Sequence, residues 1–328
     1  MNTKKKKILI IRLGAIGDVV HTTIIPTAIK QKHPDYEVHY LTQMAISPLL
    51  KNNPNIDKII PWERKQRKSL GYTLKMANLL RKEKYDIIFN LTVAIRNIFL
   101  SVMAMPKKIV NKKCFNKSWV EDYFYTAKSV LPDIEQPDRL YLFPDKESLE
   151  KIEKDIKDLP KPYIAILPGG WTDNRRQGRV WNLDNWKQLT DELISLYGGT
   201  VFVLGNKKER DFHEVLKNEN VVIKTGDYSI VESSALLSKS DIVISGDTGP
   251  VHIASAHNVP TISLLGSTSP DKIKPYGKNG HYVSAEAGCK YCWKKVCKYT
   301  KHGEKYTPCM ENITPDMIIN KIKTENIL

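Results

Sequence analysis

Three segments of the chain place glycines and ionisable side chains directly after short apolar runs. The first is IRLGAIGDVVH, residues 11–21, whose Gly14 and Gly17 allow a tight turn and close backbone approach. Asp18 falls where a helix begins, and free backbone amides favour a carboxylate there, so a helix cap explains it without any function. A dinucleotide loop, however, has a third glycine and an open helix N-terminus, and Asp18 would repel phosphate. The alternative is therefore a general base, with His21 one turn later as a packing residue or a second catalyst.

The second segment, LPGGWTDNRRQGRVW (residues 167–181), follows a strand-like run and is suited to an anion. Gly169 and Gly170 expose backbone amides, and Thr172 offers a hydroxyl. The arginines of this segment are Arg175, Arg176 and Arg179. Because a guanidinium binds phosphate through two parallel hydrogen bonds and stays charged at any relevant pH, the combination indicates a diphosphate site. A solvated basic loop is the alternative.

The third segment, SGDTGPVHIASA (residues 245–256), places a polar turn before a helix that Pro250 can begin. Its candidate anion ligands are Asp247, Thr248, Gly249 and His252. The amides of Thr248 and Gly249 can point at an anion, and His252 lies within the first helical turn. Helix capping by Asp247 or Thr248 is the alternative interpretation.

Four of the five cysteines gather near the end of the sequence, in CKYCWKKVCKYTKHGEKYTPC. They are Cys289, Cys292, Cys297 and Cys309. A Cys-x2-Cys pair followed by two more thiols can hold zinc or iron in a tetrahedral site, although the later spacings are not those of a standard zinc finger. Reduced thiols in a basic loop are an equal alternative, and a disulfide is disfavoured in a cytosol. Cys114 stands apart.

The composition is that of a globular enzyme with acidic partners. Of 328 residues, 41% are apolar and 27% charged, which excludes a disordered chain, and the length allows two domains. The formal charge of +15 favours nucleotides, phosphorylated glycolipids, anionic membranes or nucleic acid without choosing among them. The odd number of cysteines argues against a secreted disulfide scaffold. Asn90, Arg96 and Asn97 interrupt the most apolar window, so we expect no membrane span and predict a cytoplasmic protein.

Strands and helices alternate in the pattern of parallel sheets covered on both faces. The expected strands are KILIIRL, YEVHYLT, DKIIPW and YDIIFNLT in a first unit and YIAILPGG, GTVFVLG, VVIKTG, DIVISGDTG and PTISLLG in a second. The expected helices include residues 18–32, 46–52, 69–84, 185–197, 208–217 and 230–238.

The charged helix DKESLEKIEKDIKDLP separates the two sets of elements, so we predict domains at residues 1–155 and 156–328. Ligands of such sheets bind beyond the carboxyl ends of the strands, and we expect the active site in a cleft between the domains. The sequence assigns no partner to the last helix, residues 315–323. Packing back on the first domain is one possibility.

These segments in this order carry a family resemblance. The chain resembles the ADP-heptose:lipopolysaccharide heptosyltransferases of glycosyltransferase family 9. The motifs that carry the resemblance are, in order, GDVVHTTIIP, LPGGW with RVW, and SGDTGPVHIASA followed by PTISLLGSTSP. The resemblance spans nearly the whole chain, and the third motif is the most specific. It implies an α/β GT-B fold of two Rossmann-like domains facing a central cleft. It also implies that the first domain binds the acceptor, that the second binds the nucleotide sugar, and that the transfer is inverting and needs no cofactor.

The resemblance further implies roles for individual residues. Asp18 matches the family's proposed base, Arg179 a basic residue near the donor phosphates, and Glu209 an acidic residue at the donor ribose. The residues placed on the donor side are Gly169, Gly170, Thr172, Arg179, Glu209, Asp247, Thr248, Gly249 and His252, and those on the acceptor side are Gly14, Gly17, His21 and Arg96. The chemistry agrees, because a carboxylate can take the proton of a sugar hydroxyl while arginine and helix amides stabilise a departing nucleoside diphosphate.

We therefore expect transfer of heptose from ADP-heptose to an anionic inner-core glycolipid, with peripheral contact with the inner membrane surface. Candidate basic contacts are residues 4–7, 64–68 and 107–113. The alternatives are a transferase that uses another nucleotide sugar or a protein serine acceptor, and a non-catalytic nucleotide-binding module. Nothing resembles an RNA-binding aromatic signature or a recognition helix, so no nucleic-acid partner is expected.

Overall fold

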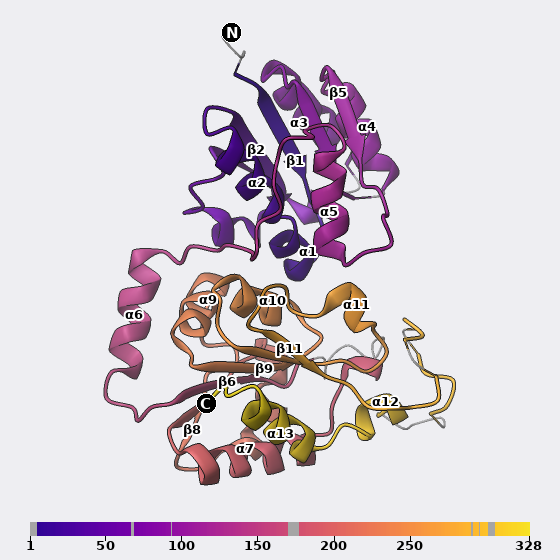
Figure 1. Ribbon diagram of the computed structural model, residues 1–328. Helices are drawn as coiled ribbons and strands as arrows, with labels where there is room; N and C mark the ends of the chain where they lie inside the picture. The colour runs from indigo at the N-terminus through magenta and orange to yellow at the C-terminus, as the bar shows by residue number, and fades with distance from the viewer. Residues whose placement is uncertain are drawn as a thin grey trace. The chain divides into compact units, whose positions relative to one another are not determined.

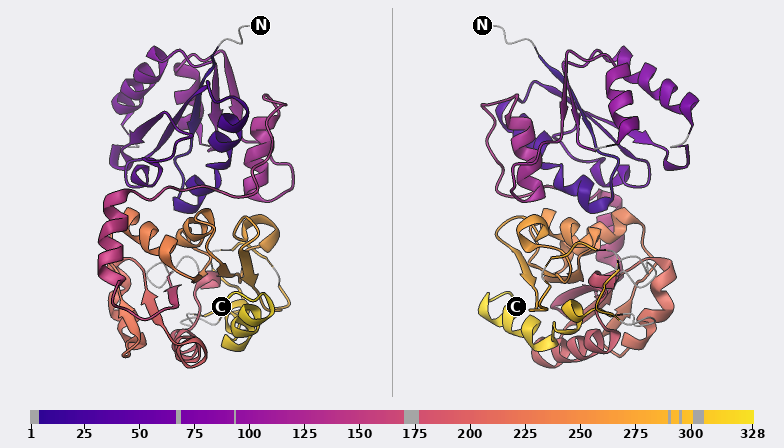
Figure 2. Two further views of the ribbon diagram at one scale, coloured as in Figure 1. Left: turned by 60° about the vertical axis from the view of Figure 1, so that its left-hand side comes forward. Right: turned by 90° about the vertical axis from the view of Figure 1, so that its right-hand side faces the viewer.

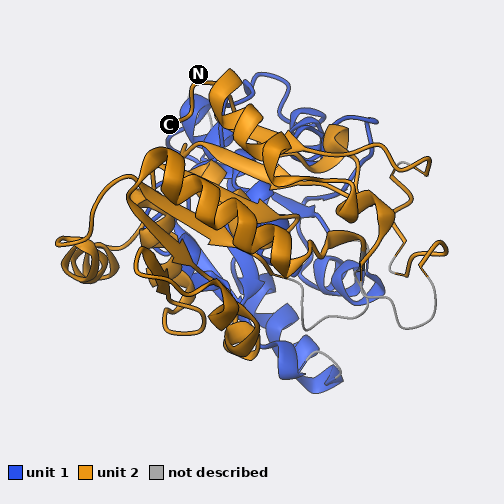
Figure 3. Ribbon diagram, turned by 90° about the horizontal axis from the view of Figure 1, so that it is seen from below, with its two compact units in different colours: residues 1–143 blue, residues 144–328 orange. Residues whose placement is uncertain are grey.

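The computed structural model describes residues 5–66, 69–92, 94–169, 177–289, 291–294, 296–300 and 306–328. The chain divides into two compact units, Met1–Phe143 and Pro144–Leu328, which Figure 3 colours separately. Each unit is built on its own parallel sheet with helices around it, so the tandem α/β organisation expected from the sequence is confirmed (Figure 1). Within the described ranges, no helix is both long and apolar enough to cross a bilayer.

Unit 1 is built on a five-stranded parallel sheet in the order β3-β2-β1-β4-β5. Its strands are β1 (Lys7–Ile11), β2 (Glu37–Gln43), β3 (Lys58–Trp62), β4 (Ile87–Asn90) and β5 (Lys108–Asn111). β1 is central, and its side chains from Ile8 to Ile11 are buried, as expected for a strand covered on both faces. The strand order reverses between β1 and β4, which is where ligands of such sheets bind.

Helices lie on both sides of the unit 1 strands (Figure 2). They are α1 (Ile16–His21), α2 (Ile24–Lys32), α3 (Leu70–Lys82), α4 (Ile95–Met103) and α5 (Trp119–Lys128), with the 3-10 turns η1 (Ser47–Leu50) and η2 (Arg64–Gln66). α3 packs against α4, and their inner sides share one apolar cluster with Leu9, Ile11 and Leu41 of the sheet. α2 packs against α5.

Unit 1 departs from the sequence prediction in three places. The helix expected over residues 18–32 is broken between α1 and α2, where the hydroxyls of Thr22 and Thr23 donate to the carbonyls of Val19 and Val20 at 2.8 and 2.7 Å. Such side-chain bonds compete with the helical pattern. The helix expected over residues 46–52 is the short turn η1. The elements α4, β5 and α5 have no counterpart in the prediction.

Unit 2 is built on a six-stranded sheet in the order β11-β10-β9-β6-β7-β8, again with every pair parallel. Its strands are β6 (Tyr163–Leu167), β7 (Thr200–Val203), β8 (Val221–Ile223), β9 (Ile242–Gly246), β10 (Thr261–Leu264) and β11 (Gly280–Val283). The five expected strands are present, and β11 is an addition. The order reverses between β6 and β9, so the loops after these strands lie at the switch point.

The described helices of unit 2 range in length from four residues to 15. They are α6 (Lys146–Ile156), α7 (Leu183–Tyr197), α8 (Arg210–His213), α9 (Ile230–Lys239), α10 (Gly249–Ala256), α11 (Pro270–Ile273), α12 (Pro308–Glu311) and α13 (Pro315–Thr324), with the 3-10 turns η3 (Gln177–Arg179), η4 (Lys207–Glu209) and η5 (Glu214–Leu216). The helix expected over residues 208–217 consists of three short pieces, η4, α8 and η5.

Helix α6 belongs to unit 2. It packs against α9, where Lys239 Nζ lies 2.5 Å from Glu153 Oε1 and Lys151 pairs with Glu232. The hydroxyl of Tyr228 donates to Asp155 at 2.8 Å. Because these contacts fix α6 on unit 2, the division of the chain falls before α6, at 143/144, whereas the boundary predicted from the sequence, 155/156, lies at the end of this helix.

Helix α13 also belongs to the core of unit 2. Its inward residues Ile318, Ile319 and Ile322 are buried in the same apolar cluster as Leu189 and Leu193 of α7. The apolar stripe of the last helix is thus covered within unit 2, where the sequence left a return to the first domain open.

Candidate active site

Asp18 lies in the first turn of α1, shortly after the carboxyl end of β1. Its Oδ1 accepts from Arg12 Nη2 at 2.8 Å, and its Oδ2 accepts from the backbone N–H of Ala15 at 3.0 Å. The side chain remains 25% exposed, so a substrate hydroxyl can still approach it. The two interpretations made from the sequence are compatible, because Asp18 caps α1 and at the same time presents an oriented carboxylate.

The glycine at position 14 is a steric requirement of this arrangement. A Cβ added to Gly14 would lie 2.5 Å from Asp18 Oδ2 and 2.8 Å from Asp18 Cβ. The turn is fixed from the other side by Gln43, whose Nε2 donates to the carbonyls of Leu13 and Gly14 at 3.2 and 2.5 Å. Gly17 is buried in the first turn of α1. Gly14 therefore makes room for the carboxylate of Asp18.

Arg12 orients Asp18, and the sequence prediction did not include it. Its guanidinium donates to the carbonyl of Leu91, just beyond β4, and its Cζ lies 5.3 Å from the ring centroid of Tyr123 on α5. The side chain is only 11% exposed. A cation held by two other elements in this way can fix a carboxylate with little freedom. The signal in the sequence is an arginine that ends a buried strand six residues before the aspartate.

His21 is buried and packs edge-on against Trp119, with the ring centroids 6.5 Å apart. Burial lowers the pKa of His21 to about 3, and the positive charges of Arg12 and Lys112 act in the same direction. The imidazole is therefore neutral at any physiological pH. This geometry favours the packing interpretation of His21 over a role as second catalyst.

A cavity of about 260 Å³ opens beside the Asp18 loop. Its lining consists of Leu13, Gly14, Ala15, Gln43, Trp62, Arg64 and Arg96. The guanidinium carbon of Arg96 lies 5.3 Å from the ring centroid of Trp62, which orients the cation by its stacking. Among the described residues that line the cavity, two carry a guanidinium group and none a carboxylate, so it is suited to an anionic group on a sugar-sized ligand.

In unit 2 the second and third predicted loops meet at an ion pair. Arg179 Nε lies 3.0 Å from Asp247 Oδ2, and Arg179 Nη1 donates to the Asp247 carbonyl at 3.4 Å. Gly169 approaches the same place, since a Cβ there would lie 3.2 Å from Thr248 Cγ2. The structure thus brings together four predicted donor residues at the carboxyl ends of β6 and β9. Gly170, Thr172, Arg175 and Arg176 lie outside the described residues.

Helix α10 begins at Gly249, with Thr248 as its N-cap and Pro250 in its first turn. The Thr248 hydroxyl lies 2.9 Å from the hydroxyl of Ser245 and makes no capping bond. Thr248 therefore occupies the N-cap position, but the capping by its side chain that the sequence left open is wrong. His252 is buried in the first turn of the helix. Since the N-cap side chain does not take up the amides of this turn, the helix N-terminus is suited to an anion.

Glu209 has a local structural role. It follows β7, it is buried, and its Oε2 accepts from the backbone N–H of Asn206 at 3.0 Å, which closes a capping box around η4. This contact explains a buried carboxylate here without a ligand. Its match to a residue at the donor ribose stays a prediction.

Three of the four clustered cysteines line a second cavity in unit 2. They are Cys289, Cys292 and Cys297, and the space is about 410 Å³. The pKa of Cys309 is raised, chiefly by burial, and the three other thiols add to the effect while a hydrogen bond from Thr307 opposes it. In the described part of the chain no disulfide joins them, and no three of their sulfurs lie within 4.8 Å of one another. The donor set suits zinc or iron, but the thiols do not form a closed site.

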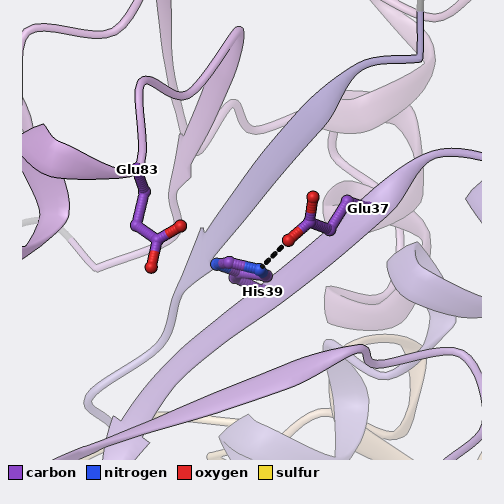
Figure 4. A group of neighbouring side chains, drawn as sticks. All are labelled: Glu37, His39 and Glu83. Carbon is purple, nitrogen blue, oxygen red and sulfur yellow. Dashed lines mark hydrogen bonds and ion pairs between the residues drawn. The ribbon is translucent and has the colours of Figure 1, made fainter.

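Glu37, His39 and Glu83 are, within the described ranges, the one group whose possible ligand atoms lie within 4.8 Å of one another (Figure 4). His39 Nε2 lies 2.8 Å from Glu37 Oε1. Lys7 Nζ lies 3.1 Å from Glu37 and 2.9 Å from Glu83, so an ammonium already supplies the cation between the carboxylates. We read the group as a structural ion network.

This network ties the amino ends of β1 and β2 to the segment before β4, at the edge of the sheet opposite to Asp18. Hydrogen bonds from Lys58 and Lys7 lower the pKa of Glu83 to about 2. The hydrogen bond to Glu83 is also the main cause of the raised pKa of Lys7. The network therefore holds the sheet together as long as Glu83 is ionised.

Two Rossmann-like units, one with an oriented carboxylate and one with an arginine beside a helix N-terminus, define a glycosyltransferase of the GT-B class. Residues 103–302 match the model of glycosyltransferase family 9 (heptosyltransferase). Because this match covers more than half of the chain, the protein belongs to that family.

Individual relatives match almost end to end. The chain is 24% identical to lipopolysaccharide heptosyltransferase 1 of Campylobacter coli, over 97% of this chain and 98% of that protein. The structure of Escherichia coli ADP-heptose lipopolysaccharide heptosyltransferase II has the same fold, with a TM-score of 0.78, 18% identity, and coverage of 97% of this chain and 98% of that one. The iron-containing dodecameric glycosyltransferase TibC of enterotoxigenic Escherichia coli superimposes with a TM-score of 0.61, 15% identity, and coverage of 98% and 78%.

The substitution Glu83→Gln tests the ion network. The folded pKa of Glu83, about 2, lies below the ordinary 4.5, so its stabilisation is complete above about pH 4.5 and is lost as the pH falls toward 2. We expect the variant to lose about 1 kcal/mol of unfolding free energy near neutral pH, and the difference from the wild type to narrow in acid. Urea titrations at about pH 6 and about pH 3 measure both values. An equal difference at both pH values would contradict the assignment.

Proposed function

We propose that this protein transfers heptose from ADP-heptose to a lipopolysaccharide inner-core acceptor, with inversion and without a catalytic metal. The observation that carries the proposal is the carboxylate of Asp18, held by Arg12 and the Ala15 amide beside a cavity with two arginines. The sugar and the acceptor class are supported by the heptosyltransferase family match and by the name of the Campylobacter coli relative. ADP-heptose is supported by the name of the Escherichia coli structure.

The proposed reaction is a single in-line displacement. Asp18 takes the proton of the acceptor hydroxyl as the hydroxyl oxygen forms a bond to the anomeric carbon of heptose. The bond from that carbon to the diphosphate oxygen breaks, and ADP leaves with the electron pair. Arg179 and the first amides of α10 are positioned in unit 2 to stabilise this negative charge, with no metal required. Attack opposite to the leaving group inverts the configuration.

We place the donor and acceptor roles in separate units. In unit 2, Arg179, Thr248, Gly249 and His252 are the proposed donor residues, and a diphosphate would compete with Asp247 for the Arg179 guanidinium. In unit 1, the cavity with Arg64 and Arg96 is the proposed site for an anionic group of the acceptor. With an inner-core glycolipid as the acceptor, we propose that the enzyme acts in the cytoplasm, in peripheral contact with the inner membrane surface.

We further propose that the four clustered thiols hold a structural zinc or iron ion. The gathering of three of them around one cavity supports this, as does the iron in the related TibC structure. Bound metal would tie the loop of Cys289, Cys292 and Cys297 to Cys309 in α12. Its role is in folding, and transfer would not depend on it as a Lewis acid.

The substitution Asp18→Asn tests the catalytic role. We expect transfer to fall at least about 10³-fold, because the amide cannot accept the proton, while ADP binding by calorimetry is unchanged. The wild type is incubated with ADP-heptose or another nucleotide sugar and with a core glycolipid or a serine peptide, and products are identified by mass spectrometry. Asp57→Asn, which removes a carboxylate of unit 1 that is paired with Lys30, is the matched control. Unchanged turnover in Asp18→Asn would remove it from this role, and consumption of other sugars alone would refute the donor.

The substitution Gly14→Ala tests whether the position of the carboxylate matters as well as its presence. The added methyl group collides with Asp18 Oδ2, so the carboxylate must leave its place against Arg12 and the Ala15 amide. We expect a loss of about 10²-fold in kcat with a small change in thermal stability. Activity at the wild-type level would show that the geometry around Gly14 is not needed.

Metal analysis tests the cysteine site. We expect about one zinc or iron per chain in protein purified without chelator, and loss of that metal in Cys292→Ser. Cys114→Ser, which removes an exposed cysteine outside the cluster, is expected to keep it. Chelators are expected to lower the thermal stability while transfer by the remaining folded protein continues. Metal-free protein of full stability would contradict the proposal.

A further inference from the structure

Helix α4 has its polar and apolar sides reversed. The side that faces the core contains Asn97 and Ser101 together with Leu100, and the Ser101 hydroxyl donates to the Asn97 carbonyl at 2.8 Å. The side that faces away carries large apolar residues, which are Ile95, Ile98, Phe99, Val102 and Met103. Ile95 is 88% exposed and Val102 54%. A helix that presents an apolar side to water marks a binding surface, because its exposure is unfavourable until something covers it.

The neighbouring helix extends the exposed apolar surface. α3 packs against α4 and exposes Leu70, Leu74 and Leu79, while Met105 follows the end of α4. Figure 1 shows the two helices in unit 1. We call the exposed side chains of α3 and α4, with Met105, the α3–α4 face. The chain continues from Met105 into β5. The exposed side chains of this face do not belong to the apolar cluster that contains Leu9, Ile11 and Leu41.

The charges of these helices are all of one sign. Neither α3 nor α4 contains an acidic residue, and the basic residues on and shortly after them are Lys75, Arg81, Lys82, Lys84, Arg96, Lys107 and Lys108. The nearest carboxylates in sequence, Glu83 and Asp86, are already paired with lysines. A partner of the α3–α4 face must therefore be apolar where it meets α4 and anionic around it.

We propose that the α3–α4 face docks on the surface of a bilayer that contains anionic phospholipid. Helices with an apolar side and lysine or arginine as their only charges lie in the plane of such surfaces, with the apolar side among the acyl chains. A protein partner is less well matched, because lysine is depleted at protein interfaces. At nine residues α4 is far too short to span a bilayer, so the contact is peripheral.

This inference deepens the proposed function and rests on it for the identity of the acceptor. Arg96 stands in the first turn of α4 and also lines the cavity beside the Asp18 loop, together with Arg64 and Gly14. A glycolipid whose lipid part stays in the bilayer can therefore present its anionic sugars to this cavity while the α3–α4 face rests on the same bilayer. The docking surface and the acceptor cavity are two parts of one unit.

Vesicle flotation tests the docking. The full-length protein is mixed with vesicles of phosphatidylglycerol and phosphatidylcholine, or of phosphatidylcholine alone, at low and high salt. We expect binding to the anionic vesicles, weakened by salt, and little binding to phosphatidylcholine alone. The double variant Ile98→Ser/Val102→Ser removes the centre of the apolar side and is expected to bind at least about tenfold more weakly.

The matched control removes similar exposed apolar groups from unit 2. Leu196 and Val215 are 50% and 51% exposed, against 41% and 54% for Ile98 and Val102, so Leu196→Ser/Val215→Ser should bind like the wild type. A second variant, Lys75→Gln/Lys82→Gln, is expected to lose the salt-sensitive part of the binding and to fold normally, since both lysines are exposed.

Two results would overturn the docking. One is that the wild type does not bind anionic vesicles, and the other is that the α4 variant and the control variant bind equally. If vesicles are not bound and sedimentation shows a dimer that Ile98→Ser/Val102→Ser dissociates, the face belongs to a second copy of the chain instead. The proposed function is tested by a separate measurement, the transfer of heptose from ADP-heptose to a glycolipid dispersed in detergent. If no transfer occurs there, the proposed function fails, whatever the vesicle binding shows. With that function intact, the α4 variant should keep transfer to the dispersed acceptor and lose it on vesicle-embedded acceptor.

Discussion

The ion pair between Arg12 and Asp18 is the constraint on which the rest of the candidate site depends. Arg12 ends the central strand and also contacts the Leu91 carbonyl after β4 and the Tyr123 ring of α5. The carboxylate is therefore positioned by three elements that are distant in sequence, and it has room only because residue 14 has no side chain. Because His21 is buried as a neutral ring, Asp18 is the ionisable side chain of α1 that reaches solvent.

The two units use the same edge of a parallel sheet for opposite electrostatic tasks. In unit 1 the turn after the central strand carries a carboxylate, which takes the place at the helix N-terminus that phosphate occupies in a dinucleotide loop. In unit 2 the turn after β9 carries Asp247 against Arg179, and the N-terminus of α10 has no side-chain cap. The proposed proton acceptor and the proposed anion site can thus coexist in one protein because each is built on its own sheet.

Much of this could be read from the sequence, and the failures have physical causes. Strands such as KILII are recognisable because both faces are buried, and Asp18, Arg179 and the GDTG turn fall in loops that follow them. Arg12 was missed because its partners Leu91 and Tyr123 lie about 80 and 110 residues away along the chain, and only the folded sheet brings them together. For the cysteines the sequence left a tetrahedral metal site and reduced thiols open as equal alternatives. In the described residues three of the four line one cavity, and no three of the sulfurs lie within 4.8 Å of one another.

Helix α4 was not predicted, and its orientation could not have been predicted from the sequence. Residues 95–103 have the periodicity of an amphipathic helix, with Asn97 and Ser101 on one side and large apolar residues on the other. Such a pattern is normally interpreted with the apolar side toward the core and the polar side toward water. In α4 the polar residues face inward and the apolar row faces outward, and only the folded unit shows this. The outward apolar row is what is expected of a helix that meets the proposed lipid surface.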